Sequence, residues 1–364
     1  MTNREKFLST INNKPNKKMP IAHFGYWDET VDKWVKEGHI KEGDDWDVIS
    51  AKLGFDFEYS TSYPCHTDLF PSFETKVLKT LDDGSLHVLN GEGVIELKKP
   101  GLVSIPSEIG HTLTDRDSWE KEYLPRLQFS EERYDFSLLK QYAESGNPIG
   151  LNGGSLYGKI RNWFGIVELS YLAVDDEDLY DEVIKTVGDL SYEIVKFGLE
   201  KAKQMGVTFD YIHFWEDICF NTGPLVSPAI YAEKVGPYYK KITDLGKQHG
   251  INIFSLDCDG KIDLLLPIWL KNGVNTMFPI EVGTWEASIA PWRKQYGMEV
   301  LGVGGMDKRV FAIDRKAVDA EIERLLPLVE LGGYIPCPDH RIAPDAEWDL
   351  VKYYCEKMRK TFDV

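Results

Sequence analysis

Carboxylates and one histidine follow five apolar segments in the second half of the chain. The residues in these positions are Glu216-Asp217, Asp257-Cys258-Asp259, Glu281, Asp307 and Asp339-His340. Carboxylate and imidazole groups exchange protons and bind metal ions. A single acid at such a position is more often a helix N-cap or a solvated loop residue. Its repetition after five segments indicates a shared site.

If these segments are parallel strands, their carboxyl ends meet at one mouth. Glu216, Asp257 and His340 are then the candidate catalytic residues. Asp257, Asp259, Glu281 and His340 are the candidate metal ligands, and zinc accepts this mixture of oxygen and nitrogen. The sequence has no HExxH motif and no paired-cysteine motif. Because neighbouring side chains in a strand point to opposite faces, we favour the two aspartates over Cys258 as ligands.

Aromatic residues near the expected strand ends are candidates for an apolar pocket that holds a flat ring. Core packing is the alternative explanation for most of them. The candidate substrate-binding residues are Phe24, Tyr26, Trp27, Tyr157 and Trp215. Two glycine-rich runs, 152–155 and 302–305, form no complete nucleotide-binding motif, and we interpret them as tight turns between strand and helix.

An alternation of strand and helix patterns runs from about residue 147 to the end of the chain, which is typical of parallel β/α units. Helical periodicity covers 157–174 and 176–205, and Ser227 before Pro228 predicts the N-cap of another helix. The fold class is therefore α/β, a (β/α)8 TIM barrel. The predicted strands are 20–24, 147–152, 210–215, 251–256, 276–280, 299–303 and 334–337.

Residues 55–130 interrupt this alternation with short alternating runs around Asp82-Asp83-Gly84, a hairpin signal. They predict a β-rich insertion in the N-terminal half of a single domain spanning 1–364. The insertion is either a lid over the substrate or an excursion without a catalytic part.

The composition narrows the classes of partner. A formal net charge of -17 disfavours nucleic acid, and the absence of a long apolar run disfavours a membrane span. Five scattered cysteines and an N-terminus without an apolar signal segment predict a reduced, cytoplasmic protein. A homodimer is compatible with the sequence.

Several segments together resemble the uroporphyrinogen decarboxylase superfamily. They are Arg4-Glu5-Lys6-Phe7-Leu8 with Pro20-Ile21-Ala22, 73–78, Gly304-Gly305-Met306-Asp307, and 332–340 with Pro344-Asp345. The resemblance implies a barrel, and it implies either porphyrinogen decarboxylation or corrinoid-dependent methyl transfer.

Porphyrinogen decarboxylases carry an arginine-rich motif after the first strand, whereas this chain reads His23-Phe24-Gly25-Tyr26-Trp27-Asp28-Glu29. Without those arginines the many carboxylates of a porphyrinogen are not neutralised. The methyltransferase branch resembles this chain differently: it binds zinc through a His-x-Cys pair and a later Cys, at positions that match Asp257, Asp259 and His340. This harder oxygen and nitrogen set suits a methoxylated aromatic methyl donor rather than a thiol.

The resemblance therefore implies the methyltransferase component of an O-demethylase system, with suspected zinc activating the ether oxygen. No Asp-x-His-x-x-Gly cobalamin motif is present, so the corrinoid belongs to a partner protein. One alternative is a metal-independent decarboxylase of a small or aromatic acid, with Asp257 or Glu216 as proton donor and His340 orienting it. Another is a barrel without catalysis that binds a corrinoid protein.

Overall fold

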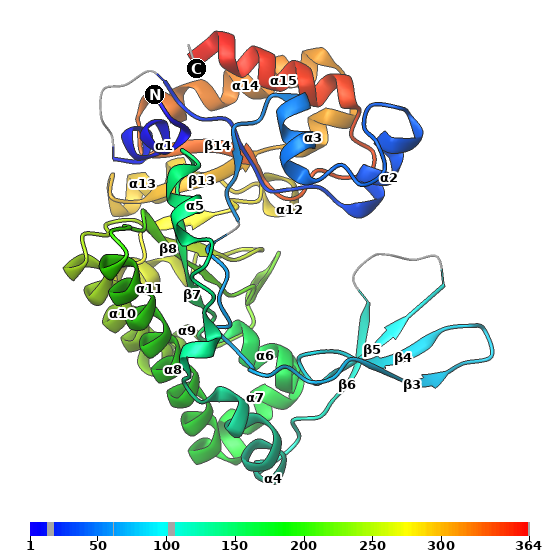
Figure 1. Cartoon of the computed structure of the whole chain (residues 1–364), viewed down its shortest axis with the longest axis vertical. Coiled ribbons are helices and arrows are strands. Elements are labelled where there is room, and N and C mark those ends of the chain that lie inside the picture. The colour runs from blue at the N-terminus through cyan, green and yellow to red at the C-terminus, as the bar shows by residue number, and fades with distance from the viewer. Residues whose placement is uncertain (13–17, 61, 101–105, 363–364) are drawn as a thin grey trace.

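The computed structural model describes residues 1–12, 18–60, 62–100 and 106–362. Its centre is a parallel six-stranded sheet in the order β14-β13-β12-β11-β8-β7, which confirms six strand predictions, with boundaries shifted by up to three residues (Figure 1). The strands are β7 (Gly150–Gly154), β8 (Tyr211–Trp215), β11 (Phe254–Asp257), β12 (Thr276–Phe278), β13 (Leu301–Met306) and β14 (Tyr334–Pro338).

Two further parallel strands, β1 (Ala22–His23) and β2 (Phe57–Glu58), pair with each other. Isolated parallel bridges join Tyr63 to Leu151 and Tyr26 to Ile342, so this pair is linked to both edges of the six-stranded sheet. The arrangement is that of a TIM-barrel-like fold. The prediction that the β-rich insertion begins at residue 55 was wrong for β2, which belongs to the parallel set.

Helices flank the strands. The longest, α8 (Glu177–Gln204), is capped by Asp176, whose side chain accepts a hydrogen bond from the Leu179 N–H. Its apolar residues recur at helical spacing and are buried against the strands. The other principal helices are α1 (Asn3–Ile11), α2 (Asp28–Lys36), α3 (Trp46–Leu53), α10 (Gly236–Gln248), α11 (Leu266–Lys271), α13 (Ile289–Tyr296), α14 (Arg315–Glu330) and α15 (Trp348–Phe362).

Three local predictions need correction. The helix expected over 157–174 is divided into α6 (Gly158–Phe164) and α7 (Ile166–Asp175), because Gly165 adopts a φ of 79° that ends the first helix. Ser227 precedes α9 (Pro228–Ile230) as expected, but its hydroxyl makes no capping hydrogen bond. The run 302–305 lies inside strand β13 and is not a turn.

Helix α1 closes the amino-terminal ends of the strands. The Phe7 ring packs against Phe57, Tyr59 and Tyr211, with ring centroids 5.7–6.1 Å apart. The opposite ends of the strands therefore remain for the site.

Four antiparallel strands within 76–100 and 106–111 form a sheet that projects from the body beside α6 (Figure 1). Its strands are β3 (Lys76–Thr80), β4 (Leu86–Leu89), β5 (Val94–Lys98) and β6 (Ser107–His111). The end of the range 55–130 is helical instead of β-rich, because Asp115 caps α4 (Arg116–Ser118) and the helical turns continue through η1 (Trp119–Tyr123) and η2 (Leu124–Leu127).

The remaining elements are short connecting helices and strands. They are η3 (Glu131–Arg133), α5 (Leu139–Glu144), β9 (Cys219–Phe220), β10 (Gly223–Pro224), η4 (Tyr231–Val235), α12 (Val282–Trp285) and η5 (Lys308–Ala312).

None of the helices in the described ranges is long and apolar enough to cross a membrane.

Candidate active site

Asp257, Asp259 and His340 come together at the carboxyl ends of β11 and β14. The His340 Nε2 atom lies 3.4 Å from Asp259 Oδ2. Asp259 Oδ1 and His340 Nδ1 are buried and have no hydrogen-bond partner in the described part of the chain. The strand ends thus bring three of the predicted site residues to one place.

Asp257 is the most unusual of these groups. Its side chain is buried, with 7% of the residue exposed. No hydrogen bond to its carboxyl group is found among the described residues. Burial, together with the carboxylates of Asp259 and Asp217, raises the pKa of Asp257 well above its usual range. Such a group retains its proton at a pH where an exposed aspartate is ionised.

Two aromatic side chains from the segment after β1 hold His340 in place. The Trp27 ring stacks on the imidazole at a centroid distance of 5.5 Å and an interplanar angle of 17°. Phe24 packs against it at 5.1 Å and also against Phe278 at 4.5 Å. The predicted substrate-binding residues Phe24 and Trp27 therefore lie at the site, where they fix the imidazole.

Glu281 lies beside the site, but both of its carboxylate oxygens are occupied. Oε2 accepts the Gly260 N–H at 2.5 Å, and Oε1 accepts the Thr284 hydroxyl at 2.8 Å. The preceding residue, Ile280, has a φ of 60°, which is strained for a β-branched side chain. A Cβ on Gly304 would lie 1.6 Å from the Pro279 oxygen, so glycine is required where β13 passes this segment.

Glu216 is enclosed behind the site, with 0% exposure. Its carboxylate accepts hydrogen bonds from the backbone N–H groups of Leu156, Tyr157 and Gly158 at 2.6–2.9 Å. The hydroxyls of Ser155 and Tyr239 also donate to it. These contacts are those of a cap for the start of α6, so Glu216 does not join the group formed by Asp257, Asp259 and His340.

Two of the predicted pocket aromatics belong to the core. Tyr26 is fully buried, and its hydroxyl is hydrogen-bonded to Ser50 at 3.0 Å. Tyr157 is 5% exposed, and its hydroxyl is hydrogen-bonded to Tyr180 at 2.9 Å. Neither ring was distinguishable from a pocket residue by type or position, because strand-end and core aromatics share the same apolar segments.

Trp215, the remaining predicted pocket aromatic, is partly buried at the end of β8. The Lys159 ammonium lies 5.2 Å from the centre of its ring. Lys159 also pairs with Glu92 in the turn between β4 and β5, and Asn162 donates to Glu92 at 3.0 Å. Helix α6 thereby fastens the four-stranded sheet to the body next to this strand end.

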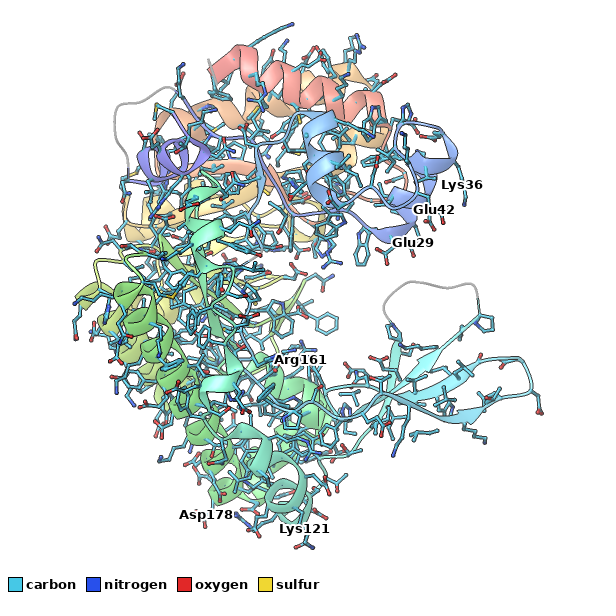
Figure 2. All side chains as sticks on the ribbon, viewed as in Figure 1. Glu29, Lys36, Glu42, Lys121, Arg161 and Asp178 are labelled. Atoms are coloured by element: carbon cyan, nitrogen blue, oxygen red, sulfur yellow. The ribbon has the colours of Figure 1, made fainter. Side chains whose placement is uncertain are left out.

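Three charged residues at the mouth were not among the predicted site residues. Arg161 of α6 donates to the Asp217 carbonyl at 2.7 Å and to its carboxylate at 3.1 Å. Figure 2 shows Arg161 on the side of the body from which the four-stranded sheet projects. Lys308 donates to the Arg341 carbonyl at 3.0 Å, and burial lowers the pKa of its ammonium. Asp217 and Lys308 follow strands directly and were detectable by position, whereas Arg161 lies within a helix and had no such signal.

The described side chains do not fit the zinc site expected from the resemblance. Within residues 1–12, 18–60, 62–100 and 106–362, no group of three or more His, Cys, Asp and Glu side chains is placed to hold a metal ion. The predicted four-ligand set of Asp257, Asp259, Glu281 and His340 is therefore not assembled among the described side chains. One physical reason is that both Glu281 oxygens are engaged in loop contacts.

Comparison with known proteins gives a fold and no family. No family model matches the sequence, and no curated protein matches it. A solved methyltransferase from Methanosarcina mazei is similar in structure, with a TM-score of 0.61, 14% identity and coverage of 100% of both chains. At this identity the likeness shows the fold alone.

Two further solved structures are similar at lower scores. One is a B12-independent methionine synthase from Shewanella sp. W3-18-1, with a TM-score of 0.46, 14% identity and coverage of 94% of this chain and 98% of that one. The other is a putative vitamin-B12 independent methionine synthase from Listeria monocytogenes, with a TM-score of 0.41, 13% identity and coverage of 95% and 98%.

Proposed function

We propose that this chain is a cytoplasmic methyltransferase that removes the methyl group of a methoxylated aromatic compound. The acceptor is the cobalt of a corrinoid carried by a separate protein. The catalytic unit is one closed barrel spanning 1–364, and the insertion predicted at 55–130 carries the four-stranded sheet β3–β6. The observation that carries the proposal is the buried Asp257 carboxyl beside the Asp259–His340 pair, in a barrel-like fold shared with a solved methyltransferase.

An aryl methyl ether releases its methyl group more readily when the oxygen leaves protonated. Because burial and the nearby carboxylates raise the pKa of Asp257 well above its usual range, this carboxyl keeps its proton to a higher pH than an exposed aspartate does. Asp257 donates that proton to the ether oxygen as the methyl–oxygen bond breaks. The corrinoid of the partner protein would supply the nucleophile that accepts the methyl group, and the phenol would leave with the proton from Asp257.

His340 and Asp259 act next to this proton donor. The stacked Trp27 ring fixes the plane of the imidazole, and Asp259 Oδ2 lies 3.4 Å from Nε2, where it pairs with the imidazole when the ring is protonated. The His340 and Asp259 side chains together form a polar side of the site and orient the leaving phenol toward Asp257. No step of this mechanism is assigned to a metal ion, since the described side chains do not form a ligand set.

The test is a demethylation assay with the purified chain, a methoxyarene and a reduced corrinoid protein, followed by the absorbance of the methylated corrinoid. Asp257→Ala is expected to lower kcat by roughly 100-fold or more, the usual contribution of a general acid. Asp117→Ala, an exposed change on α4, is the matched control. Full activity of Asp257→Ala, or corrinoid that stays unmethylated with the unaltered chain, would contradict the proposal.

A second candidate is a metal-independent decarboxylase of a small or aromatic acid. The Arg161 guanidinium favours it, because Nε is buried without a partner in the described chain and would donate to a substrate carboxylate. Asp257 would then protonate the carbon that loses carbon dioxide. This reaction would release carbon dioxide without any corrinoid protein. Leaving the corrinoid protein out of the assay therefore distinguishes the decarboxylase from the methyltransferase.

A further inference from the structure

Helix α7 presents a row of apolar side chains to solvent. Val167, Tyr171 and Val174 are spaced four and three residues apart, which puts them on one face of the helix. They are 61%, 62% and 82% exposed, whereas Leu169 on another face is buried. A row with this spacing normally packs against the core of a protein. Its exposure indicates a contact surface for another macromolecule.

The strand β3, at one edge of the projecting sheet, is a second uncovered surface. All five of its residues are exposed, and they include the apolar side chains of Val77 and Leu78. The register with β4 shifts between Val77 and Lys79. Lysines and such irregularities protect an edge strand from pairing with a further strand. A partner would therefore contact β3 through side chains and not through an added strand.

The two surfaces carry opposite charges. On β3, Lys76 and Lys79 flank the apolar pair. On α7, Glu168 and Asp175 are seven residues apart and form an acidic row beside the apolar row. All four charged side chains are exposed, and none of them forms an ion pair within the part of the chain that the structure describes. An apolar strip with lysines thus matches an apolar strip with carboxylates.

Both surfaces belong to the end of the molecule away from the two termini (Figure 1). The base of the sheet meets the junction of α6 and α7, because a Cβ on Gly165 would lie 2.6 Å from His111 Nε2. Since β3 and α7 both remain exposed, they do not cover each other within one chain.

We infer that two copies of this chain pair about a twofold axis, with β3 of each copy lying against α7 of the other. A second copy is the partner that carries both matching surfaces, and the axis makes the same contact twice. The buried apolar area is then double that of a single contact. This inference does not depend on the proposed function.

The test is to reverse the charges of each surface and then to mix the two variants. Lys76→Glu/Lys79→Glu reverses β3, and Glu168→Lys/Asp175→Lys reverses α7. Alone, each variant places like charges opposite each other in both contacts, so the Kd of its dimer should rise roughly tenfold or more. In the mixture, both contacts of a heterodimer regain opposite charges. Sedimentation velocity should therefore show heterodimers with about the Kd of the unaltered chain.

The matched control is Lys140→Glu, an exposed change on α5, which should dimerise like the unaltered chain. Tyr171→Ala tests the apolar row and should weaken the dimer roughly tenfold or more, as the loss of an aromatic anchor does. Circular dichroism checks that every variant is folded. An unaltered chain that stays monomeric overturns the inference. Charge-reversed variants that dimerise like the unaltered chain, or a mixture that gains no heterodimer, also overturn it.

Discussion

Replacing Glu216 with alanine would leave the start of helix α6 without its acceptor. Three backbone N–H groups and the Tyr239 hydroxyl would lose their partner inside the fold. Each buried donor left unpaired costs about 1–3 kcal/mol, but water entering the space and relaxation of the loop make these costs less than additive. Removing one member of a buried charged network typically costs about 3–5 kcal/mol, and we expect that loss in the free energy of unfolding.

Burial raises the pKa of Glu216, which means that the ionised carboxylate is itself costly in this position. That cost offsets part of the gain from the hydrogen bonds. We therefore expect the loss in the free energy of unfolding for Glu216→Ala to lie in the lower half of the range of about 3–5 kcal/mol. Glu216→Gln keeps the volume and one acceptor oxygen but turns an NH2 group toward the N–H donors. Its expected loss is therefore about 2–3 kcal/mol, smaller than that of the alanine variant.

The measurement is urea denaturation at pH 7 followed by circular dichroism, with Glu193→Ala on the exposed side of α8 as the control. The control should change the free energy of unfolding by less than about 0.5 kcal/mol. A Glu216→Ala protein that loses under about 1 kcal/mol of stability while losing turnover completely would refute the capping role. It would instead support the interpretation of Glu216 as the proton donor.

Three other predictions concern pH and the projecting sheet. Burial lowers the pKa of His23 to about 3 and that of His213 to about 4, so the stability from these neutral rings is present above pH 6.5 and is lost as the pH falls. Each ring should contribute a slope of about 1.4 kcal/mol per pH unit below pH 6.5, and His213→Gln should remove one such slope in acid denaturation. Because the pKa of Asp257 is raised in the folded state, its effect on stability runs the other way, and the free energy of unfolding falls as the pH rises. Asp257→Asn should therefore gain stability relative to the unaltered chain as the pH rises from 4 to 7. A stability difference between the two proteins that does not change with pH would contradict this. Glu92→Ala should speed hydrogen exchange within 76–111 by about tenfold and leave the body unaffected, because it releases the contacts with α6; unchanged exchange would show that the sheet is held elsewhere.

The parallel strands were predictable because buried parallel strands are short apolar runs followed by polar residues. This pattern located β8 to within one residue. It failed for β2, whose two residues, Phe57 and Glu58, are too short to show any periodicity. Helix α7 was merged with α6 for a related reason, since the apolar pattern continues across Gly165 and only the backbone conformation separates them.

The grouping of the candidate site residues was predictable in part. Position at the strand ends predicted that Asp257, Asp259 and His340 lie close together, and in the structure they do. Position could not reveal that Glu216 turns back to cap a helix, because the direction of a side chain at a strand end depends on which N–H groups the next loop presents. Arg161 was missed because it approaches the mouth from within α6, where sequence spacing carries no information about the strand ends.

The acidic residues at the mouth differ in which hydrogen-bond donors already contact their carboxylate oxygens. Glu216 and Glu281 have their oxygens filled by backbone N–H and hydroxyl donors, so they shape the loops that follow β7, β11 and β12. Asp217 is balanced by Arg161. Asp257 alone combines burial with a carboxyl that has no partner in the described chain, and the carboxylates around it make its ionisation still more costly. The surrounding carboxylates therefore favour the protonated form of Asp257, which is the form that the proposed reaction requires.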